Sequence, residues 1–253
     1  MHTFVAELHV HTVLSPCAEV EMIPPLIVQA ALERGIHLIA VTDHNASANV
    51  AAVQRAAIGT ALHVLPGMEV QTQEEVHLLC LFDTLGQLAA WQTCVDQALP
   101  PLRNNPAYFG EQFVVDETGD FIRREEQLLL TSAGLSLTAA FHQVTALGGL
   151  AIPAHVDRKA NGLLAVLGFV PLDLPFAALE ISRRLTPQQA RLAYAQLQAY
   201  PLVQSGDVHR LDEYLGANEF RLQAPTIAEL RHALQGTAGR SYRNRLDNLQ
   251  GIK

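Results

Sequence analysis

The chain has 253 residues, of which 49% are hydrophobic and 17% are charged, and its formal net charge at pH 7 is −8. This length allows one large domain with a full hydrophobic core, and the lack of a basic run argues against binding of long nucleic acid. No apolar stretch reaches membrane-spanning length, and no basic segment precedes an apolar run at the start, so we expect neither a membrane partner nor a cleaved signal. The three cysteines form no CxxC pair, which favours a reduced, cytoplasmic setting.

Strand and helix signals alternate over residues 3–100. Strands are predicted over residues 4–9, 36–42, 63–67 and 76–82, and helices over residues 24–34, 46–57 and 86–98. Apolar runs of this kind, separated by helices, favour parallel strands that are buried on both faces.

Residues 104–130 interrupt this alternation, and a turn at Gly119 between two short apolar segments predicts a β-hairpin, with a solvated loop as the alternative. Helices are then predicted over residues 136–147 and 187–199, and strands over residues 150–154, 177–181 and 202–205. Thr226 and Glu229 predict a capping box at the start of a last helix. We expect one domain over residues 1–235 and a polar, peripheral tail over residues 236–253.

Five clusters of metal-ligand residues each follow an apolar run. They are His9 with His11, Asp43 with His44, Glu69 with His77, His155, and Asp207 with His209. Two histidines one residue apart on a strand point to the same face and can bind one ion, although an isolated pair is more often structural. Mixed imidazole and carboxylate ligands suit zinc, manganese or iron, and a bridging carboxylate allows two ions to deprotonate a shared water.

In order and spacing, these clusters resemble the motifs of the PHP (polymerase and histidinol phosphatase) family of metal-dependent phosphoesterases. The matching segments are ELHVHT (7–12), VTDHN (41–45), GMEV (67–70), His77, PAH (153–155) and SGDVH (205–209). The resemblance covers nearly the whole chain. It implies a distorted (β/α)7 barrel that holds two or three divalent transition-metal ions.

The resemblance also implies how the ligands are grouped. His9, His11, Glu69 and Asp207 would hold the first ion, Glu69, His77 and His155 the second, and His44 with His209 the third. Asp43 would orient its neighbours. Where many members have a histidine or aspartate after the first motif, this chain has Cys17, whose thiolate would favour zinc or iron. A small buried thiol is the alternative, so a trinuclear and a dinuclear centre both stay open.

Hydrolysis of a phosphoester by a hydroxide shared between two ions is the implied reaction. The candidate catalytic residues are Asp43, Arg158 and His209, the last as an acid toward the leaving oxygen, with a metal-bound water as the alternative acid. The candidate substrate-binding residues are Arg158, Arg183, Arg184 and Arg210, each with a solvated surface position as its alternative. Glu180, on an apolar strand, is expected to contact a ligand or an arginine, or to form a structural salt bridge.

A small phosphomonoester or nucleotide is the expected substrate, and the hairpin would cap the site against larger ones. The alternatives are an exonuclease-like phosphodiesterase that acts on short nucleic-acid ends and a non-catalytic metal-binding regulatory module. An amidohydrolase-type barrel is disfavoured, because its bridging lysine has no counterpart: Lys159 and Lys253 lie elsewhere. The sequence does not predict the oligomeric state.

Overall fold

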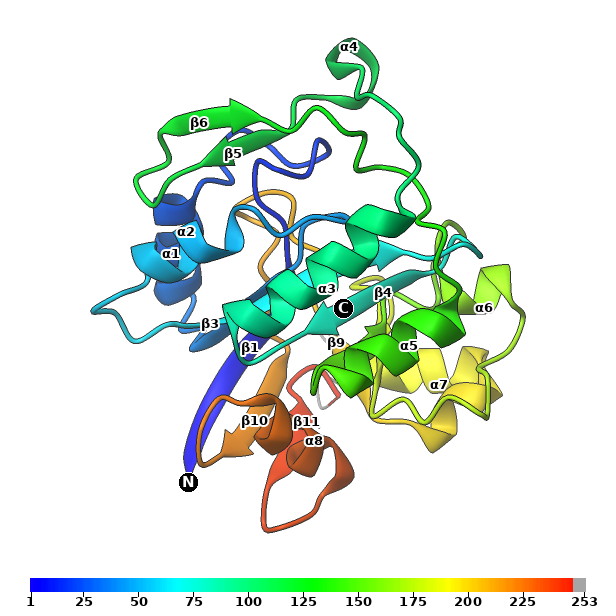
Figure 1. Ribbon diagram of the computed structural model, residues 1–253. Coiled ribbons are helices and arrows are strands. Elements are labelled where there is room, and N and C mark those ends of the chain that lie inside the picture. The colour runs from blue at the N-terminus through cyan, green and yellow to red at the C-terminus, as the bar shows by residue number, and fades with distance from the viewer. Residues whose placement is uncertain (248–253) are drawn as a thin grey trace.

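A seven-stranded sheet forms the centre of the molecule, and the computed structural model describes residues 1–247 (Figure 1). In spatial order its strands are β11 (Ser241–Asn244), β10 (Asn218–Leu222), β1 (His2–Val10), β2 (Leu38–Val41), β3 (His63–Gln71), β4 (His77–Leu81) and β7 (Leu150–Pro153). The sheet curls into half a barrel, and β8 (Leu179–Ile181) and β9 (Leu202–Gln204) form a separate parallel pair. This mixed α/β arrangement confirms the predicted distorted barrel.

Strand direction differs from the prediction at one place. β1, β2 and β3 are parallel to one another, but β4 is antiparallel to both β3 and β7. The connection between β3 and β4 spans only residues 72–76, which is too short for the crossover that a parallel neighbour requires. The start of β4 therefore lies at the same edge of the sheet as the ends of β1, β2 and β3.

Both faces of the sheet are buried, as the unbroken apolar runs predict. In β2, Leu38 and Ala40 belong to one hydrophobic cluster, and Ile39 and Val41 belong to the other. The cluster that contains Ile39 and Val41 also includes side chains of α1 (Pro24–Glu33), α2 (Val50–Ala56), α3 (Leu85–Ala98) and α5 (Leu137–Ala146). The cluster that contains Leu38 and Ala40 includes side chains of α8 (Ile227–Gln235), which therefore covers the opposite face of the sheet.

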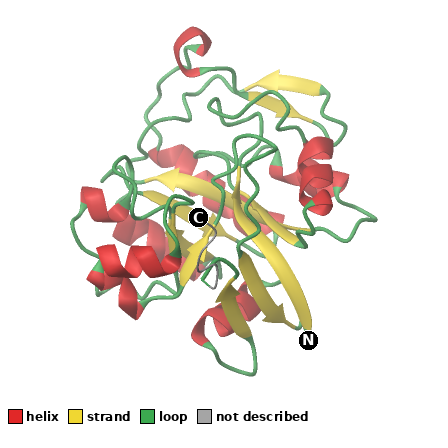
Figure 2. Cartoon of the chain, turned by 180° about the vertical axis from the view of Figure 1, so that it is seen from behind, coloured by secondary structure: helices red, strands yellow, loops and turns green. Residues whose placement is uncertain are grey.

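The predicted hairpin is present. β5 (Phe113–Val115) and β6 (Phe121–Arg124) pair antiparallel, and α4 (Pro106–Phe109) precedes them. Figure 2 shows the hairpin and α4 beyond the loops at one end of the sheet, whereas the N-terminus lies at the other end. The remaining helices are α6 (Leu163–Val166), α7 (Pro187–Ala193) and the 3-10 helix η1 (Ala195–Ala199).

The C-terminal segment differs from the predicted peripheral tail, because Ser241–Asn244 forms edge strand β11 on β10. Residues 248–253 of that tail lie outside the described residues. The predicted capping box of α8 is half formed: the Thr226 side chain accepts from the Glu229 N–H, but the Glu229 carboxylate binds Gln223 and Arg240 instead. Over residues 1–247, no helix has the length and apolarity needed to cross a bilayer.

Candidate metal centre

Three strands of the sheet, β1, β3 and β4, bring the first ligands together. His9 lies in β1 and His11 directly follows it, and their Nε2 atoms are 3.1 Å apart. Glu69 projects from β3, with Oε1 3.3 Å from His9 Nε2 and Oε2 3.4 Å from His11 Nε2. His77 reaches the same carboxylate, at 2.8 Å, from the start of the reversed strand β4. All four side chains are buried.

Loops that follow β2, β7 and β9 supply the other ligands. His44 Nδ1 lies 3.0 Å from Glu69 Oε2, and His155 Nε2 lies 3.2 Å from Glu69 Oε1. Asp207 Oδ1 lies 3.2 Å from His9 Nε2. His155 and Asp207 have positive φ angles of 29° and 53°, which are uncommon for residues other than glycine. Such backbone conformations persist where the surroundings impose them, often at functional sites.

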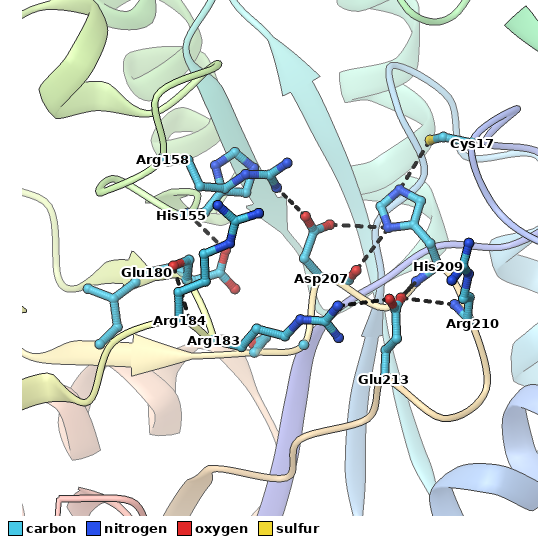
Figure 3. Close-up of a pocket in the computed structure, with 14 residues that line it drawn as sticks. Cys17, His155, Arg158, Glu180, Arg183, Arg184, Asp207, His209, Arg210 and Glu213 are labelled. Atoms are coloured by element: carbon cyan, nitrogen blue, oxygen red, sulfur yellow. Dashed lines mark hydrogen bonds and ion pairs between the residues drawn. The ribbon is translucent and has the colours of Figure 1, made fainter.

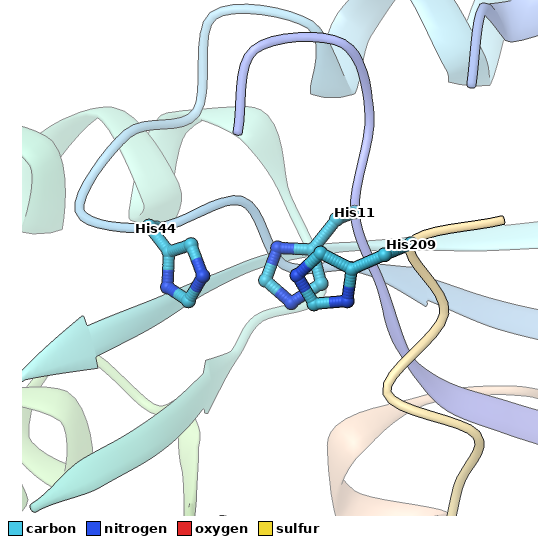
Figure 4. Close-up of side chains that lie close together, drawn as sticks. All are labelled: His11, His44 and His209. Carbon is cyan, nitrogen blue, oxygen red and sulfur yellow. The ribbon is translucent and has the colours of Figure 1, made fainter. Parts of the chain in front are cut away.

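The structure forms three overlapping groups, within each of which the ligand atoms lie within 4.8 Å of one another. They are His9 with His11, Glu69 and Asp207; His44 with Glu69 and His77; and His11 with His44 and His209 (Figure 4). The first group has the composition expected for the first ion. In the second group His44 takes a place expected for His155, which nonetheless contacts the same carboxylate oxygen.

Two carboxylate oxygens in the centre fit a cation. Among the described residues, Glu69 Oε2 and Asp207 Oδ1 are buried and accept no hydrogen bond. A buried acceptor without a partner costs free energy, and divalent cations compensate such oxygens. The donor set of imidazoles and carboxylates therefore fits transition-metal ions.

Electrostatics couples these groups strongly. Burial lowers the pKa of His11, but Asp207 and Glu69 outweigh it and raise the pKa to about 9. Burial raises the pKa of Glu69, but the surrounding imidazoles hold that pKa well below its usual value. For His77, burial dominates and lowers the pKa to about 4. A proton on His11 thus offsets part of the carboxylate charge, and a metal ion would displace it.

Hydrogen bonds fix which nitrogen of each imidazole faces the centre. His9 Nδ1 donates to Glu180 Oε2 at 2.9 Å, and His11 Nδ1 donates to the Ser15 hydroxyl at 2.9 Å. Both Nε2 atoms are therefore left to bind an ion. The Ser15 hydroxyl donates in turn to Asp43 Oδ1, so Asp43 lies behind the ligands and orients them. Glu180 thus accepts hydrogen bonds from His9 and from the His155 N–H, and within residues 1–247 it pairs with no arginine.

A cavity of about 330 Å³ opens beside the centre (Figure 3). All four predicted substrate-binding arginines line it. Arg158 pairs with Asp207 Oδ2, Arg183 pairs with Glu213 at 3.0 Å, and Arg210 pairs with Glu19 at 2.8 Å. Arg184, by contrast, forms no ion pair within residues 1–247, and its guanidinium points into the cavity.

A model of the PHP domain matches residues 7–135, which is half of the chain. The chain belongs to the PHP domain family. The family that the motifs indicate is therefore confirmed. No curated protein sequence matches the chain.

Solved structures with a similar fold are distant in sequence. The lesion-specific endonuclease Q of Pyrococcus furiosus has 18% identity and a TM-score of 0.65 over 95% of this chain and 58% of that chain. An amidohydrolase from Chromobacterium violaceum has 18% identity and a TM-score of 0.57, and the match covers 97% of this chain and 99% of that chain. A protein from Bifidobacterium adolescentis, classed as a metal-dependent phosphoesterase, has 17% identity and a TM-score of 0.54. The match covers 81% of this chain and 87% of that chain.

Two carboxylates that hold the ligand loops of this PHP domain were missed in the sequence. Glu7 accepts hydrogen bonds from the backbone N–H groups of Gly206 at 2.6 Å, Leu215 at 2.7 Å and Gly216 at 2.8 Å. Burial raises the pKa of Glu7 to about 7, although these N–H groups lower it. Glu213 accepts from the His209 N–H at 2.8 Å. An acidic residue within the apolar run of β1 was the available signal for Glu7.

Proposed function

We propose that this protein hydrolyses a small phosphomonoester, with a nucleotide as one candidate. The observation that carries this proposal is the composition of the cavity wall. Asp207 Oδ1 is buried there without a hydrogen-bond partner among the described residues, and the guanidinium groups of Arg158 and Arg184 line the same cavity. Carboxylates and imidazoles suit metal ions, and guanidinium groups suit phosphate oxygens. A single phosphate group bound between the metal ions and the guanidinium groups would interact favourably with both.

Six residues would hold two ions in this proposal. They are His9, His11, Glu69 and Asp207 for one ion and Glu69, His77 and His155 for the other. Two bound ions supply a nucleophile at neutral pH and neutralise phosphate oxygens. Asp43 keeps His11 oriented through Ser15, and Glu180 keeps His9 oriented.

Arginines at the cavity would orient the substrate. Arg184 is free to bind phosphate oxygens, and Arg158 can do so after leaving Asp207 Oδ2. His209 donates from Nδ1 to the Asp207 carbonyl at 2.8 Å, so its Nε2 lone pair faces the cavity rim. That geometry suits a metal ligand better than the acid expected from the sequence.

The segment 104–130 is proposed to cap the site. Asn45, next to His44, donates to the carbonyls of Leu129 and Thr131 at 2.8 Å, and Asn49 donates to the Phe113 carbonyl at 2.9 Å. The cap is therefore anchored to the loop that carries a ligand. Replacing only the turn 117–120 with a shorter one leaves these anchors intact, and we expect larger phosphoesters to be accepted. An unchanged substrate range would refute the cap.

Phosphodiester cleavage in nucleic acid is the second candidate, because the fold similarity to endonuclease Q covers 95% of this chain. The charges on the cap argue against it. Arg123 and Arg124 on the cap, and Arg103 directly before it, each pair with a glutamate, at 2.8 or 2.9 Å. No unpaired basic track therefore leads from the described cap to the cavity, as binding of a long backbone would require.

The experiment is a substrate comparison on protein reconstituted with zinc, manganese or iron. Phosphomonoesters, nucleotides, phosphodiesters and DNA containing an abasic site are compared, with Glu69→Gln as the inactive reference. We expect turnover of a phosphomonoester that Glu69→Gln lacks. Cleavage of DNA alone would favour the second candidate, and no turnover of any substrate with any metal would leave a non-catalytic metal-binding module.

A further inference from the structure

Residues 182–185, directly after β8, form a turn on one side of the cavity, which we call the arginine turn. Arg184 is exposed on this turn and forms no ion pair within residues 1–247. On the other side of the cavity, Cys17 lies with its sulfur 3.1 Å from His209 Nε2 (Figure 3). Cys17 is exposed, so the small buried thiol that the sequence left open is wrong. The contacts that hold the arginine turn decide where the Arg184 charge lies in the cavity.

A single buried amide holds both ends of the arginine turn. Gln204, the last residue of β9, is fully buried. Its Nε2 donates to the Ser182 carbonyl at 2.9 Å and to the Leu185 carbonyl at 2.7 Å. Both hydrogens of the NH₂ group are therefore used. Because the two carbonyls share one nitrogen, the turn cannot open without leaving a buried donor unpaired, which is unfavourable.

Asp157, on the loop after β7, fixes the first residue of the arginine turn. Its Oδ1 accepts from the Ser182 N–H at 2.7 Å, and its Oδ2 accepts from the Ser182 hydroxyl at 2.6 Å. The Ser182 hydroxyl oxygen accepts in turn from the Arg184 N–H at 3.3 Å. Since Asp157 lies between His155 and Arg158 in sequence, the arginine turn is also tied to a loop that carries a metal-ligand residue.

Buried polar side chains connect Gln204 to the C-terminal strand β11. Asn244, which is buried, donates from Nδ2 to Gln204 Oε1 at 3.3 Å. Asn218 in β10 accepts from the Gln204 N–H at 2.9 Å and donates to the Gln204 carbonyl at 2.8 Å. The Tyr242 hydroxyl lies 2.6 Å from the Leu202 carbonyl and 3.0 Å from Asn218 Oδ1. Strand β11 falls within the predicted peripheral tail, yet its side chains support the strand that ends at the cavity.

We propose that Gln204 is a positioning residue that presents Arg184 to the phosphate group of the substrate, and that β11 supports it through Asn244. A binding side chain on a turn whose ends are already fixed loses less conformational entropy when it orders around a ligand. Neither Gln204 nor Asn244 lines the cavity, so their effect on the substrate passes through the arginine turn. This inference rests on the proposed function and extends substrate binding to a strand outside the cavity.

Binding of inorganic phosphate tests the positioning role. Zinc-reconstituted full-length protein is titrated with inorganic phosphate by calorimetry for the wild type, Gln204→Met, Arg184→Ala and the double variant. Methionine is similar in length to glutamine but donates no hydrogen bond. We expect the Kd to rise roughly fivefold in Gln204→Met and roughly tenfold in Arg184→Ala, and the double variant to match Arg184→Ala. Effects that multiply in the double variant, or a wild type that binds no phosphate, would overturn the proposal.

A matched control and a milder variant complete the test. Gln54 also donates from Nε2 to a backbone carbonyl, that of Val64 at 2.9 Å, but lies away from the cavity, so Gln54→Met should leave the phosphate Kd unchanged. Asn244→Ala keeps the Gln204 amide and removes its support, and we expect the Kd to rise roughly twofold. An equal rise in Gln54→Met and Gln204→Met would overturn the positioning role.

Steady-state kinetics separates positioning from a general structural defect. We expect Gln204→Met to raise KM for a phosphomonoester and to leave kcat unchanged, because Arg184 contacts the phosphate in both the ground state and the transition state. A fall in kcat at constant KM would contradict this role. Protein that shows the expected phosphate binding but hydrolyses no phosphoester would overturn the proposed function and leave the role of Gln204 standing. Hydrolysis with Kd and KM unaffected by Gln204→Met would do the reverse.

Discussion

Side chains on or directly beside strands form one half of the metal centre, and side chains on loops form the other. The strand half consists of His9, His11, Glu69 and His77, and the loop half of His44, His155, Asp207 and His209. Strand ligands are placed by the hydrogen-bond ladders of β1, β3 and β4. The loop ligands lie outside the named strands, where only isolated bridges join His44 to Glu69 and Val208 to Val10. Two of these ligands, His155 and Asp207, have positive φ angles.

Buried carboxylates that are not themselves proposed ligands support the loop half through backbone hydrogen bonds. Glu7 holds both ends of the loop from Gly206 to Gly216, and Glu180 accepts from the His155 N–H at 3.1 Å. Asp43 accepts from the Thr12 N–H at 2.7 Å. The loop half therefore depends on acidic residues whose role is structural. Substitutions in these residues can separate the two halves.

The largest expected effect comes from the side chain that both halves share. Glu69→Gln removes the charge that faces His9, His44, His77 and His155. We expect kcat to fall on the order of 10³-fold, because ligand charge no longer holds the ions that stabilise the transition state. Metal content is measured beside activity. Glu219→Gln on β10 is the matched control, and full activity of Glu69→Gln would contradict a common centre.

Glu7→Gln is expected to affect the loop half selectively. Three N–H groups donate to its two oxygens, so an amide NH₂ must face a backbone donor. We expect about 10- to 100-fold weaker metal binding. Glu180→Gln is the comparison, because Glu180 Oε2 makes both described contacts and Oε1 makes none, so the amide oxygen preserves them. Metal titration of both variants measures the affinity. An equal loss of metal affinity in Glu7→Gln and Glu180→Gln would contradict the selective role of Glu7.

Arg183 and Arg184 are neighbours at the cavity but differ in their partners. Glu213 already pairs with Arg183, whereas Arg184 is unpaired within residues 1–247. We expect Arg184→Ala to raise KM for a phosphomonoester about tenfold by removing a charge-assisted hydrogen bond, and Arg183→Ala to raise it less. Steady-state kinetics with one metal gives the comparison. The reverse order would show that Arg183 leaves Glu213 to bind substrate.

The smallest effect is expected far from the centre. A hydrogen bond from Arg240 lowers the pKa of Glu229 to about 2. A lowered carboxyl pKa stabilises the fold above pH of about 4.5, and this contribution is lost as the pH falls toward 2. Glu229→Gln should therefore flatten the acid side of the stability profile slightly, with metal content unchanged. Urea unfolding between pH 7 and 3 measures the free energy of unfolding of both proteins. A changed metal content in Glu229→Gln would contradict the independence of this ion pair from the metal centre.

Local sequence predicts the strand half well, because His9, His11 and Glu69 end or follow an apolar run and His77 lies at the start of one. The direction of β4 was missed, although the short connection over residues 72–76 allows only a hairpin. β10 was missed because it is short and half polar, with only Phe220 and Leu222 buried as hydrophobic residues. The geometry of the loop after β9 depends on Glu7, about 200 residues away, and no local pattern reveals such a contact.

The reversed direction of β4 also orders the assembly of the centre during folding. Glu69 and His77 are only 8 residues apart in sequence and meet within one hairpin, whereas Glu7 and Gly206 are 199 residues apart. Contacts of low sequence separation lose little chain entropy and form early. We therefore expect a nascent chain to present a weak two-ligand site long before Asp207 arrives. High-affinity metal uptake would then report that the barrel has closed.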